Sequence, residues 1–410
     1  MLVGSQAALL LSLFFLPLST AGLNIGVVLS LVLWLLSGTV KKSLRMGWRN
    51  PLVLACSGLF GLLLVGVFYP GVPWKDALHG LLPYRKLIFV IPLLFLFSQP
   101  FAKAHGLRPY LLAMAITLAL SYLHSVWPFE WAFHSRRGEY WDHAIFKHHI
   151  IQNMFMTFLV VPWVIWNHQR PKAFKNFLFW IGLFVICFNV WIMVHGRTGH
   201  LCLAMVLLWL IWCYAPTQQR TKMLLGSIVL GVALGAFLFS SQTRFSKIAE
   251  EISIYEKGKL EGSPTGQRLE FWKQSYAAFK ERPILGWGTG SYSGQYCKRG
   301  ASKLSCEIGA YNPHNQYVFL AVQLGVVGLL AYLSFLVYLF VQAQKLPLSA
   351  KFMAGSTLLM LAIHSLFDSP LFVVTEGHFY ILLLSYAFAS WPTQAVLPIT
   401  TTNENEALRA

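Results

Sequence analysis

The sequence has few charged residues. Asp, Glu, Lys and Arg together make up 11% of its 410 residues, whereas hydrophobic residues make up 56% and the mean hydropathy is +0.57. Soluble globular domains carry about 25% charged residues, so this composition excludes an ordinary soluble protein. Cysteine is also sparse, with six residues. Four of them lie in apolar stretches, where we expect inert packing residues: Cys56, Cys187, Cys202 and Cys213.

Aspartate is the scarcest acidic residue. The chain has only Asp76, Asp142 and Asp368, and it contains no Asp-x-Asp pair of the kind that holds a divalent metal against a phosphate group. We therefore expect metal-independent chemistry and no cofactor. A dinucleotide fingerprint is also missing: the glycines of the segment 283–290 follow no predicted strand and lie in no βαβ unit. That segment is interpreted as a flexible turn.

Long apolar runs dominate the chain. Runs of this length fit helices that cross a hydrocarbon core of about 30 Å, so the sequence predicts an all-α polytopic membrane protein with about twelve transmembrane helices. The first two and the last two runs are short or poorly divided, and each pair could instead be a re-entrant hairpin. The runs are 7–21, 23–38, 51–69, 82–98, 110–127, 144–166, 174–194, 198–215, 223–240, 315–342, 350–367 and 370–391.

The positions of the basic residues indicate the orientation. No charge precedes Lys41, which favours a retained span over a cleavable signal peptide at the N-terminus. Alternate loops carry thirteen Lys or Arg residues and no Asp or Glu. By the positive-inside rule these loops are cytoplasmic, and so are both termini. The net charge of +17 therefore reflects topology and does not indicate a nucleic-acid partner.

One long polar segment, 241–313, is predicted to face outward. It separates nine spans in 1–240 from three spans in 314–391, and a cytoplasmic tail follows at 392–410. Within it, residues 265–282 have a helical period and an aromatic stripe that would lie on the membrane surface: Leu269, Trp272, Tyr276 and Phe279. Cys297 and Cys306 both fall in this segment, where a disulfide is plausible.

Three outward features carry groups suited to chemistry on a phosphate-bearing lipid: Arg197-Thr198-Gly199, Arg268, and His314-Asn315. Arginine binds phosphate bidentately and stays charged, and histidine acts as a general base near neutral pH. Each feature also has a plain structural interpretation. Arg197 could reach from a helix end to the membrane surface, Arg268 could pair with Glu270 or a lipid headgroup, and His314 could be a cap or packing residue.

Two glycines follow the histidine at helical spacing. Gly325 and Gly328 lie 11 and 14 residues beyond His314. On one continuous helix these positions fall within about 40° of the histidine's direction. We therefore expect one helix face with an imidazole above a shallow groove, where a lipid chain or a close-packed helix could lie.

Some polar residues are secondary candidates for the site. Arg85 and Lys86, at the outward end of the fourth span, could add a phosphate contact, although reaching to the membrane surface is the simpler interpretation. Asp368 could orient the His314 ring through its second nitrogen. A further group is similar to a metal site only loosely and is interpreted as a polar rim facing the acceptor: Asp142, His143, Lys147, His148 and His149.

These motifs resemble a known superfamily. The stretch Arg268-Leu-Glu-Phe-Trp through Arg282-Pro-Ile-Leu-Gly-Trp-Gly288, followed by His314-Asn315 with Gly325 and Gly328, is similar to the signature of O-antigen ligases and polymerases. Arg197-Thr198-Gly199 matches the smaller motif of that superfamily. The close resemblance covers roughly residues 194–330. It implies a glycosyltransferase of GT-C-like fold that works at the periplasmic face of the bacterial inner membrane.

The resemblance also implies substrates and roles. The donor would be a glycan on undecaprenyl diphosphate, and the acceptor a sugar hydroxyl of lipid A–core. Arg197 and Arg268 would neutralise the diphosphate, and His314 would deprotonate the acceptor, with inversion at the anomeric carbon. An O-antigen polymerase is the main alternative. A protein O-oligosaccharyltransferase is disfavoured because only 19 residues follow the last predicted span. A lipid-linked glycan flippase is disfavoured because ionisable residues are nearly absent from the middle of the spans.

Overall fold

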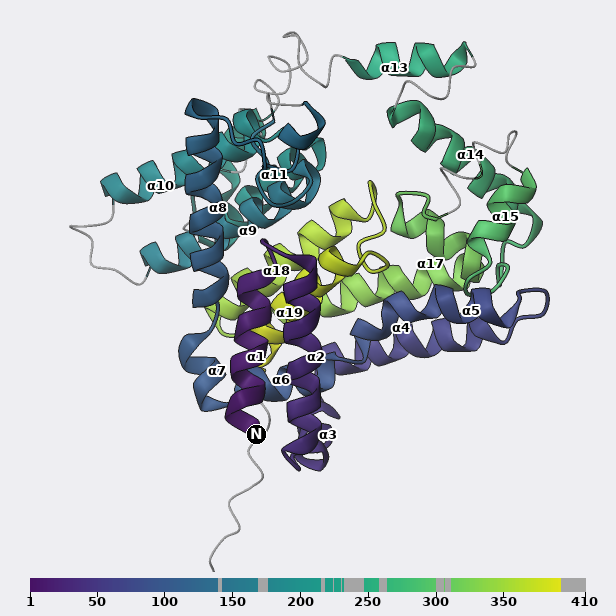
Figure 1. Ribbon diagram of the computed structural model, residues 1–410, viewed down its shortest axis with the longest axis horizontal. Coiled ribbons are helices and arrows are strands. Elements are labelled where there is room, and N and C mark those ends of the chain that lie inside the picture. The colour runs from purple at the N-terminus through teal and green to yellow at the C-terminus, as the bar shows by residue number, and fades with distance from the viewer. Residues whose placement is uncertain are drawn as a thin grey trace, which may run out of the picture.

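The protein is helical throughout the part that the computed structural model describes (Figure 1). The structure describes residues 1–138, 142–168, 176–214, 218–223, 225–229, 231, 247–257, 264–299, 306 and 311–391. No strand occurs among these residues. The all-α class predicted from the apolar runs is therefore confirmed for the described chain.

Twenty helical elements are given bounds in this part of the chain. They are α1 Leu2–Phe15, α2 Thr20–Leu36, α3 Val40–Gly47, α4 Pro51–Val67, α5 Trp74–Leu81, the 3-10 helix η1 Leu82–Leu87, α6 Val90–Ser98, α7 Pro100–His105, α8 Arg108–Val126, the 3-10 helix η2 Ser135–Arg137, α9 His149–His168, α10 Asn176–Phe188, the π-helix η4 Asn189–Met193, α11 Arg197–Tyr214, α13 Lys247–Glu256, α14 Pro264–Glu281, α15 Tyr292–Arg299, α17 Gln316–Ala343, α18 Leu348–His364 and α19 Val374–Phe388.

Several of these helices suit a membrane interior. Five helical segments in the described residues are long and apolar enough to cross one, or six if α2 and α3, which are bent by 106°, count as one span. Four more apolar helices are shorter, at 10–17 residues. Helices overlap eleven of the twelve predicted runs, and the ninth run, 223–240, lies largely outside the described residues. These features fit a polytopic membrane protein, while the number of spans stays a prediction.

Helix α19 lies at the centre of the bundle. Almost every residue from Thr375 to Phe388 is buried, so other parts of the protein surround the helix on all sides. It contacts α18, α6, η1, α4 and α2, and Figure 1 shows it behind the pair α1 and α2. The short connection between α18 and α19 is therefore held on a rigid base, and it carries Asp368.

Helix α17 is broken at Gly325. That residue has φ 63° and ψ −156°, a conformation open in practice only to glycine. The predicted groove on one continuous helix face is therefore wrong for two reasons. The helix begins only at Gln316, so His314 precedes it with φ 50°, and the break at Gly325 changes the direction of everything beyond.

The segment that follows Pro283 fills this break. Backbone N–H groups of Trp287 and Gly288 donate to the carbonyls of Val322 and Gln323, at 3.1 and 2.7 Å. In return, Val326 N–H donates to the Pro283 carbonyl at 2.7 Å. Both sides thus satisfy backbone groups that the interrupted helix leaves open. The prediction of a flexible turn in 283–290 is wrong, because these hydrogen bonds fix the turn.

The predicted surface helix is present. It runs from Pro264 to Glu281, one residue away from the predicted bounds at each end. Its buried residues, however, include Glu270, Phe271, Ser275 and Ala278, and the helix contacts α13, α15 and α17. Of the predicted aromatic stripe, Tyr276 is 59% exposed, whereas Trp272 packs against the core. The stripe is therefore divided between an exposed and a packed part, and its position on a membrane surface stays a prediction.

Candidate active site

His314 lies in a short turn just before α17. Its backbone N–H donates to Oδ1 of Asn312 at 2.9 Å, which stabilises the uncommon positive φ. The next residue, Asn315, caps α17 by accepting from the backbone N–H of Val318 at 3.0 Å. Its Nδ2 donates to the carbonyl of Leu366 at 3.1 Å. Both ends of the Asn315 amide therefore hold the turn in place and tie it to the connection between α18 and α19.

The imidazole of His314 contacts Asp368. Nδ1 lies 3.2 Å from Oδ1 of the carboxylate. The same oxygen accepts from Nδ2 of Asn312 at 3.0 Å and from the backbone N–H of Ser369 at 2.7 Å. The Asp368 side chain is 14% exposed, whereas that of His314 is 40% exposed. The carboxylate thus lies behind the ring, and the ring is open to solvent.

Asp368 is the anionic partner of this pair. Burial alone raises the pKa of its carboxyl, but the hydrogen bond and charge of His314, with smaller contributions from neighbours, outweigh burial, and the net pKa lies well below the ordinary range. An ionised carboxylate can only accept hydrogen bonds. We therefore assign the ring proton of His314 to Nδ1, which leaves Nε2 as the basic nitrogen.

Arg268, in the first turns of α14, has a guanidinium with no hydrogen bond or ion pair to any residue that the structure describes. Burial lowers its pKa; Asp368 opposes this shift, and Arg197 adds to it. Arg268 thus interacts electrostatically with both Asp368 and Arg197. Because an arginine stays protonated even so, this site holds a cation for which the described protein offers no counterion in contact.

The same part of α14 packs on the histidine turn. The Phe271 ring stacks on the His314 ring with centroids 6.1 Å apart and an interplanar angle of 26°. Nε1 of Trp272 donates to the carbonyl of Pro313 at 3.0 Å. Arg268 lies one helical turn before Phe271. These contacts place the guanidinium-bearing turn of α14 beside the imidazole.

Arg197 is the first residue of α11 and is engaged by α13 and α14. Nη2 lies 3.3 Å from Oε1 of Glu251, and Nη1 donates to Oγ1 of Thr265 at 3.5 Å. The side chains of Arg197 and Glu251 are 26% and 16% exposed. Arg197 therefore differs from Arg268 because a carboxylate already contacts its guanidinium.

The structure does not place Arg85 and Lys86 beside these groups. Nη1 of Arg85 donates to the Leu82 carbonyl within its own turn, at 2.9 Å. Lys86 is buried, and its Nζ donates to the carbonyl of Val373 at 2.6 Å. Its side chain also fills the space beside Gly377 in α19. Neither residue contacts His314, Arg197 or Arg268 in the described structure.

A second polar group lies beneath Asp368. Nδ1 of His364 is 3.0 Å from the Tyr380 hydroxyl, and Nε2 is 3.7 Å from Oε2 of Glu376. Polar atoms of His364, Asp368 and Glu376 all lie within 4.8 Å of one another. His364 ends α18 and Glu376 lies in the first turn of α19. Asp368, the carboxylate that contacts His314, therefore belongs to a buried polar cluster where α18 ends and α19 begins.

The polar rim predicted around the start of the sixth span is wrong for two of its members. Asp142 is fully buried, and Lys147 is 7% exposed with its Nζ donating to Oγ1 of Thr20 at 2.6 Å. Both side chains face the protein interior, so neither offers a surface to an acceptor.

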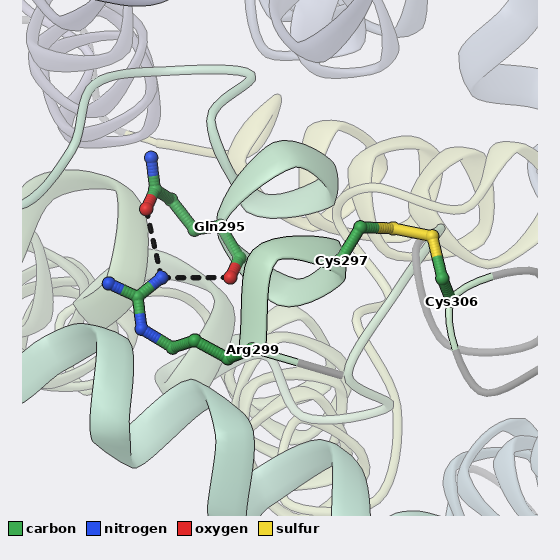
Figure 2. Close-up of a disulfide and its surroundings, with 4 residues drawn as sticks. All are labelled: Gln295, Cys297, Arg299 and Cys306. Atoms are coloured by element: carbon green, nitrogen blue, oxygen red, sulfur yellow. Dashed lines mark hydrogen bonds between the residues drawn. A yellow bond between two sulfur atoms is a disulfide. The ribbon is translucent and has the colours of Figure 1, made fainter. Parts of the chain in front are cut away.

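The long polar segment 241–313 contains a disulfide between Cys297 and Cys306 (Figure 2). Cys297 belongs to α15, and Arg299 in the same helix donates from Nη1 to Gln295, at 2.8 Å to the backbone carbonyl and 2.9 Å to Oε1. Nε of Arg299 also donates to Oε1 of Glu281, at the end of α14, at 2.9 Å. The plausible disulfide is thus present, and α15 is fixed to the helix that carries Arg268.

Sequence reasoning missed Glu251, Asn312, His364 and Glu376. Glu251, next to Glu250, and Glu376 have no recognisable motif around them. Asn312 lies two residues before His314, but an Asx turn that accepts from the i+2 N–H is a local signal that could have indicated it. His364 becomes informative only when Asp368 and Glu376 are brought to it by the fold.

Comparisons with known proteins agree with the motifs. A family described as O-antigen ligase matches residues 155–333, a range that contains Arg197, Arg268 and His314. An uncharacterized protein of Haemophilus influenzae is 23% identical over 344 residues, which cover 79% of this chain and 81% of that protein. The match supports what the sequence motifs indicated: residues 155–333 of this chain are similar to the O-antigen ligase family.

Proposed function

We propose that this chain is an O-antigen ligase that transfers a glycan from undecaprenyl diphosphate to a sugar hydroxyl of lipid A–core at the periplasmic face of the inner membrane. The observation that supports it most strongly is the juxtaposition of two groups. His314, backed by the Asp368 carboxylate, lies beside a turn of α14 whose Arg268 has no partner among the described residues. A base next to an uncompensated cation suits a nucleophilic hydroxyl and an anionic leaving group.

The proposed step forms one bond to the anomeric carbon, breaks another, and moves one proton. The acceptor hydroxyl oxygen attacks the anomeric carbon while Nε2 of His314 takes the hydroxyl proton. The bond between that carbon and the diphosphate oxygen breaks, and its electron pair leaves with the diphosphate. Attack from the opposite face inverts the anomeric centre. Asp368 stabilises the imidazolium that forms, as an anion on the far side of the ring.

The leaving group needs charge neutralisation and no proton, because a diphosphate is a weak base. Arg268 can supply a bidentate contact without giving up a protein partner. Arg197 is different because Glu251 lies 3.3 Å from its Nη2. Its guanidinium would therefore have to contact the substrate and Glu251 together, or exchange one for the other. In this mechanism two guanidinium groups replace the divalent metal that many phosphate-handling enzymes use, so we expect transfer to be metal-independent.

A flippase would need ionisable groups along a path through the membrane. Two buried ionisable residues of the central bundle lie at helix ends, whereas buried Lys86 lies within the span-length segment Trp74–Ser98. His364 is the last residue of α18, and Glu376 is the third residue of α19. His364 and Glu376 lie close to Asp368. This arrangement supports a site that substrates reach from one side of the membrane.

The test is a reaction of purified protein with an undecaprenyl-diphosphate glycan. Lipid A–core, a second lipid-linked glycan and a pilin peptide are offered together, and the products are separated by mass. We expect glycan on lipid A–core. Extension of the lipid-linked glycan would make the chain a polymerase, and a modified peptide would make it a protein O-oligosaccharyltransferase. Absence of every product, together with glycan-lipid movement across vesicles, would overturn the proposal in favour of a flippase.

A further inference from the structure

Three histidines converge in the connection between α8 and α9. His134 precedes η2, His148 precedes α9, and His149 is the first residue of α9. One ring nitrogen from each lies within 4.8 Å of the other two. The ring centroids are 3.9 Å apart for His148 and His149, 4.9 Å for His134 and His149, and 5.2 Å for His134 and His148.

The spacing of the polar atoms suits a common central ion. Nδ1 of His149 lies 3.1 Å from Nε2 of His134 and 3.2 Å from Oδ2 of Asp142. In a tetrahedral zinc site, metal–ligand distances of about 2.0–2.1 Å put neighbouring ligand atoms roughly 3.3 Å apart. The two separations are thus close to the edge length of such a tetrahedron. Imidazole nitrogens and a carboxylate oxygen are also the donor atoms that zinc prefers.

Asp142 provides a second, independent observation. Its side chain is fully buried, and Oδ2 lies 3.2 Å from Nδ1 of His149. The other oxygen accepts from the backbone N–H of Ala144 at 3.1 Å, which fixes the carboxylate. Burial raises the pKa of Asp142, but contact with His149 and the charges of nearby histidines outweigh burial and lower it. A buried carboxylate is a costly arrangement unless a positive charge lies next to it.

We propose that His134, His148 and His149 form a binding site for one transition-metal ion of zinc type, with the Asp142 carboxylate beside His149. Three imidazoles are the protein ligands of a zinc site that keeps one coordination position open. His134 and His149 are largely buried and His148 is partly exposed, so the ion has a route of entry beside His148. The site lies outside residues 155–333, which match the ligase family.

The position of the site indicates what the ion stabilises. Asn153, one turn after His149, donates from Nδ2 to the carbonyls of Val194 and Gly196, at 2.8 and 3.3 Å. A Cβ on Gly196 would lie 3.2 Å from the His149 carbonyl. The first turn of α9 is therefore packed against the residue that precedes Arg197. An ion that fixes this turn holds the loop that carries Arg197.

The experiment uses the full chain purified in detergent without a polyhistidine tag. The protein is dialysed with Zn²⁺, passed over a chelating resin, and its metal content is measured by mass spectrometry. We expect about one equivalent of zinc per chain. His149→Ala and Asp142→Asn are compared with His79→Ala, which removes an exposed histidine outside the cluster. Loss of the His149 ligand should weaken zinc binding by more than the roughly 10- to 100-fold that loss of an outer hydrogen bond costs, and Asp142→Asn should weaken it by that smaller factor. His79→Ala should bind as the wild type does.

A second measurement needs no variant. X-ray absorption of zinc-loaded wild-type protein should show nitrogen and oxygen neighbours at about 2.0–2.1 Å with imidazole scattering. Zinc should also raise the temperature of unfolding of the wild type, because it binds the folded state. A wild type that retains no zinc, or a His149→Ala variant that retains it as tightly as the wild type, would overturn the proposal. The cluster would then be a metal-free Asp–His hydrogen-bonded group.

Discussion

The carboxylate of Asp368 lies 3.2 Å from Nδ1 of His314, although the two residues are 54 positions apart. The contact joins the turn before α17 to the connection between α18 and α19. Asn312 strengthens it by donating to the same carboxylate oxygen at 3.0 Å. The orientation of the imidazole is thus set by the fold before a substrate binds, which is the arrangement that a positioned general base requires.

Asp368→Asn tests the role of this carboxylate. An amide is neutral and cannot stabilise the imidazolium that forms during transfer. We expect kcat to fall on the order of 10²-fold, with donor KM little changed, because the effect lies in the proton-transfer step. Steady-state kinetics of purified protein measure both constants. Asp76→Asn, which changes an exposed aspartate, is the control and should be neutral. An unaltered kcat in Asp368→Asn would show that the contact only packs the turn.

Arg268→Lys tests bidentate recognition of the diphosphate. A lysine keeps the charge but cannot present two parallel N–H donors. We expect turnover to fall by about 10²- to 10³-fold, as when one donor to a developing negative charge is removed. Thermal stability should change little, because no described residue is bound to Arg268. Lys273→Ala removes an exposed cation from the same helix and should leave turnover intact. Normal turnover in Arg268→Lys would exclude Arg268 from the site.

Glu251→Gln tests whether Glu251 competes with the substrate for Arg197. The ion pair is partly exposed, so its contribution is modest at about 0.2–1 kcal/mol. Releasing Arg197 should lower donor KM by up to roughly fivefold, the factor that 1 kcal/mol represents. Glu250→Gln changes the exposed neighbouring residue and is the control. A raised KM in Glu251→Gln alone would show instead that Glu251 holds Arg197 in its working position.

Gly325→Ala tests the break in α17. The backbone there has φ 63° and ψ −156°, and an added Cβ would lie 2.2 Å from the Ile284 carbonyl oxygen. The conformation alone should cost about 1–3 kcal/mol, so we expect a lower unfolding temperature and a lower yield of folded protein. Gly61→Ala in α4 adds the same methyl where no atom lies within 4 Å. It should raise helix stability by about 0.5–1 kcal/mol. Equal unfolding temperatures for the two variants would contradict the break.

The sequence indicated local structure better than it indicated how segments meet. Helix α14 was placed within one residue because its period is clear and Pro283 ends it. The break at Gly325 was missed because the apolar pattern continues on both sides of the glycine. What breaks the helix is a set of backbone hydrogen bonds to the 283–288 segment, about 40 residues earlier. Backbone pairing of this kind leaves no trace in residue type.

The sequence indicated the charged groups of the candidate site and one partner, Asp368, which contacts His314, but it did not indicate the other partners. Arginine and histidine at the ends of predicted spans are conspicuous in an apolar chain. Glu251 and Asn312 were missed because each becomes relevant only through the neighbour that the fold supplies. His134 was missed for the same reason, since 15 residues separate it from His149.

The most direct measurement is a single-turnover transfer assay with His314→Ala. Purified variant and wild type are each mixed with undecaprenyl-diphosphate glycan and lipid A–core, and the rate of product formation is measured. We expect the rate to fall about 10²- to 10⁴-fold, with donor binding and the unfolding temperature close to those of the wild type. A variant that binds the donor and transfers glycan at the wild-type rate would contradict a base at His314.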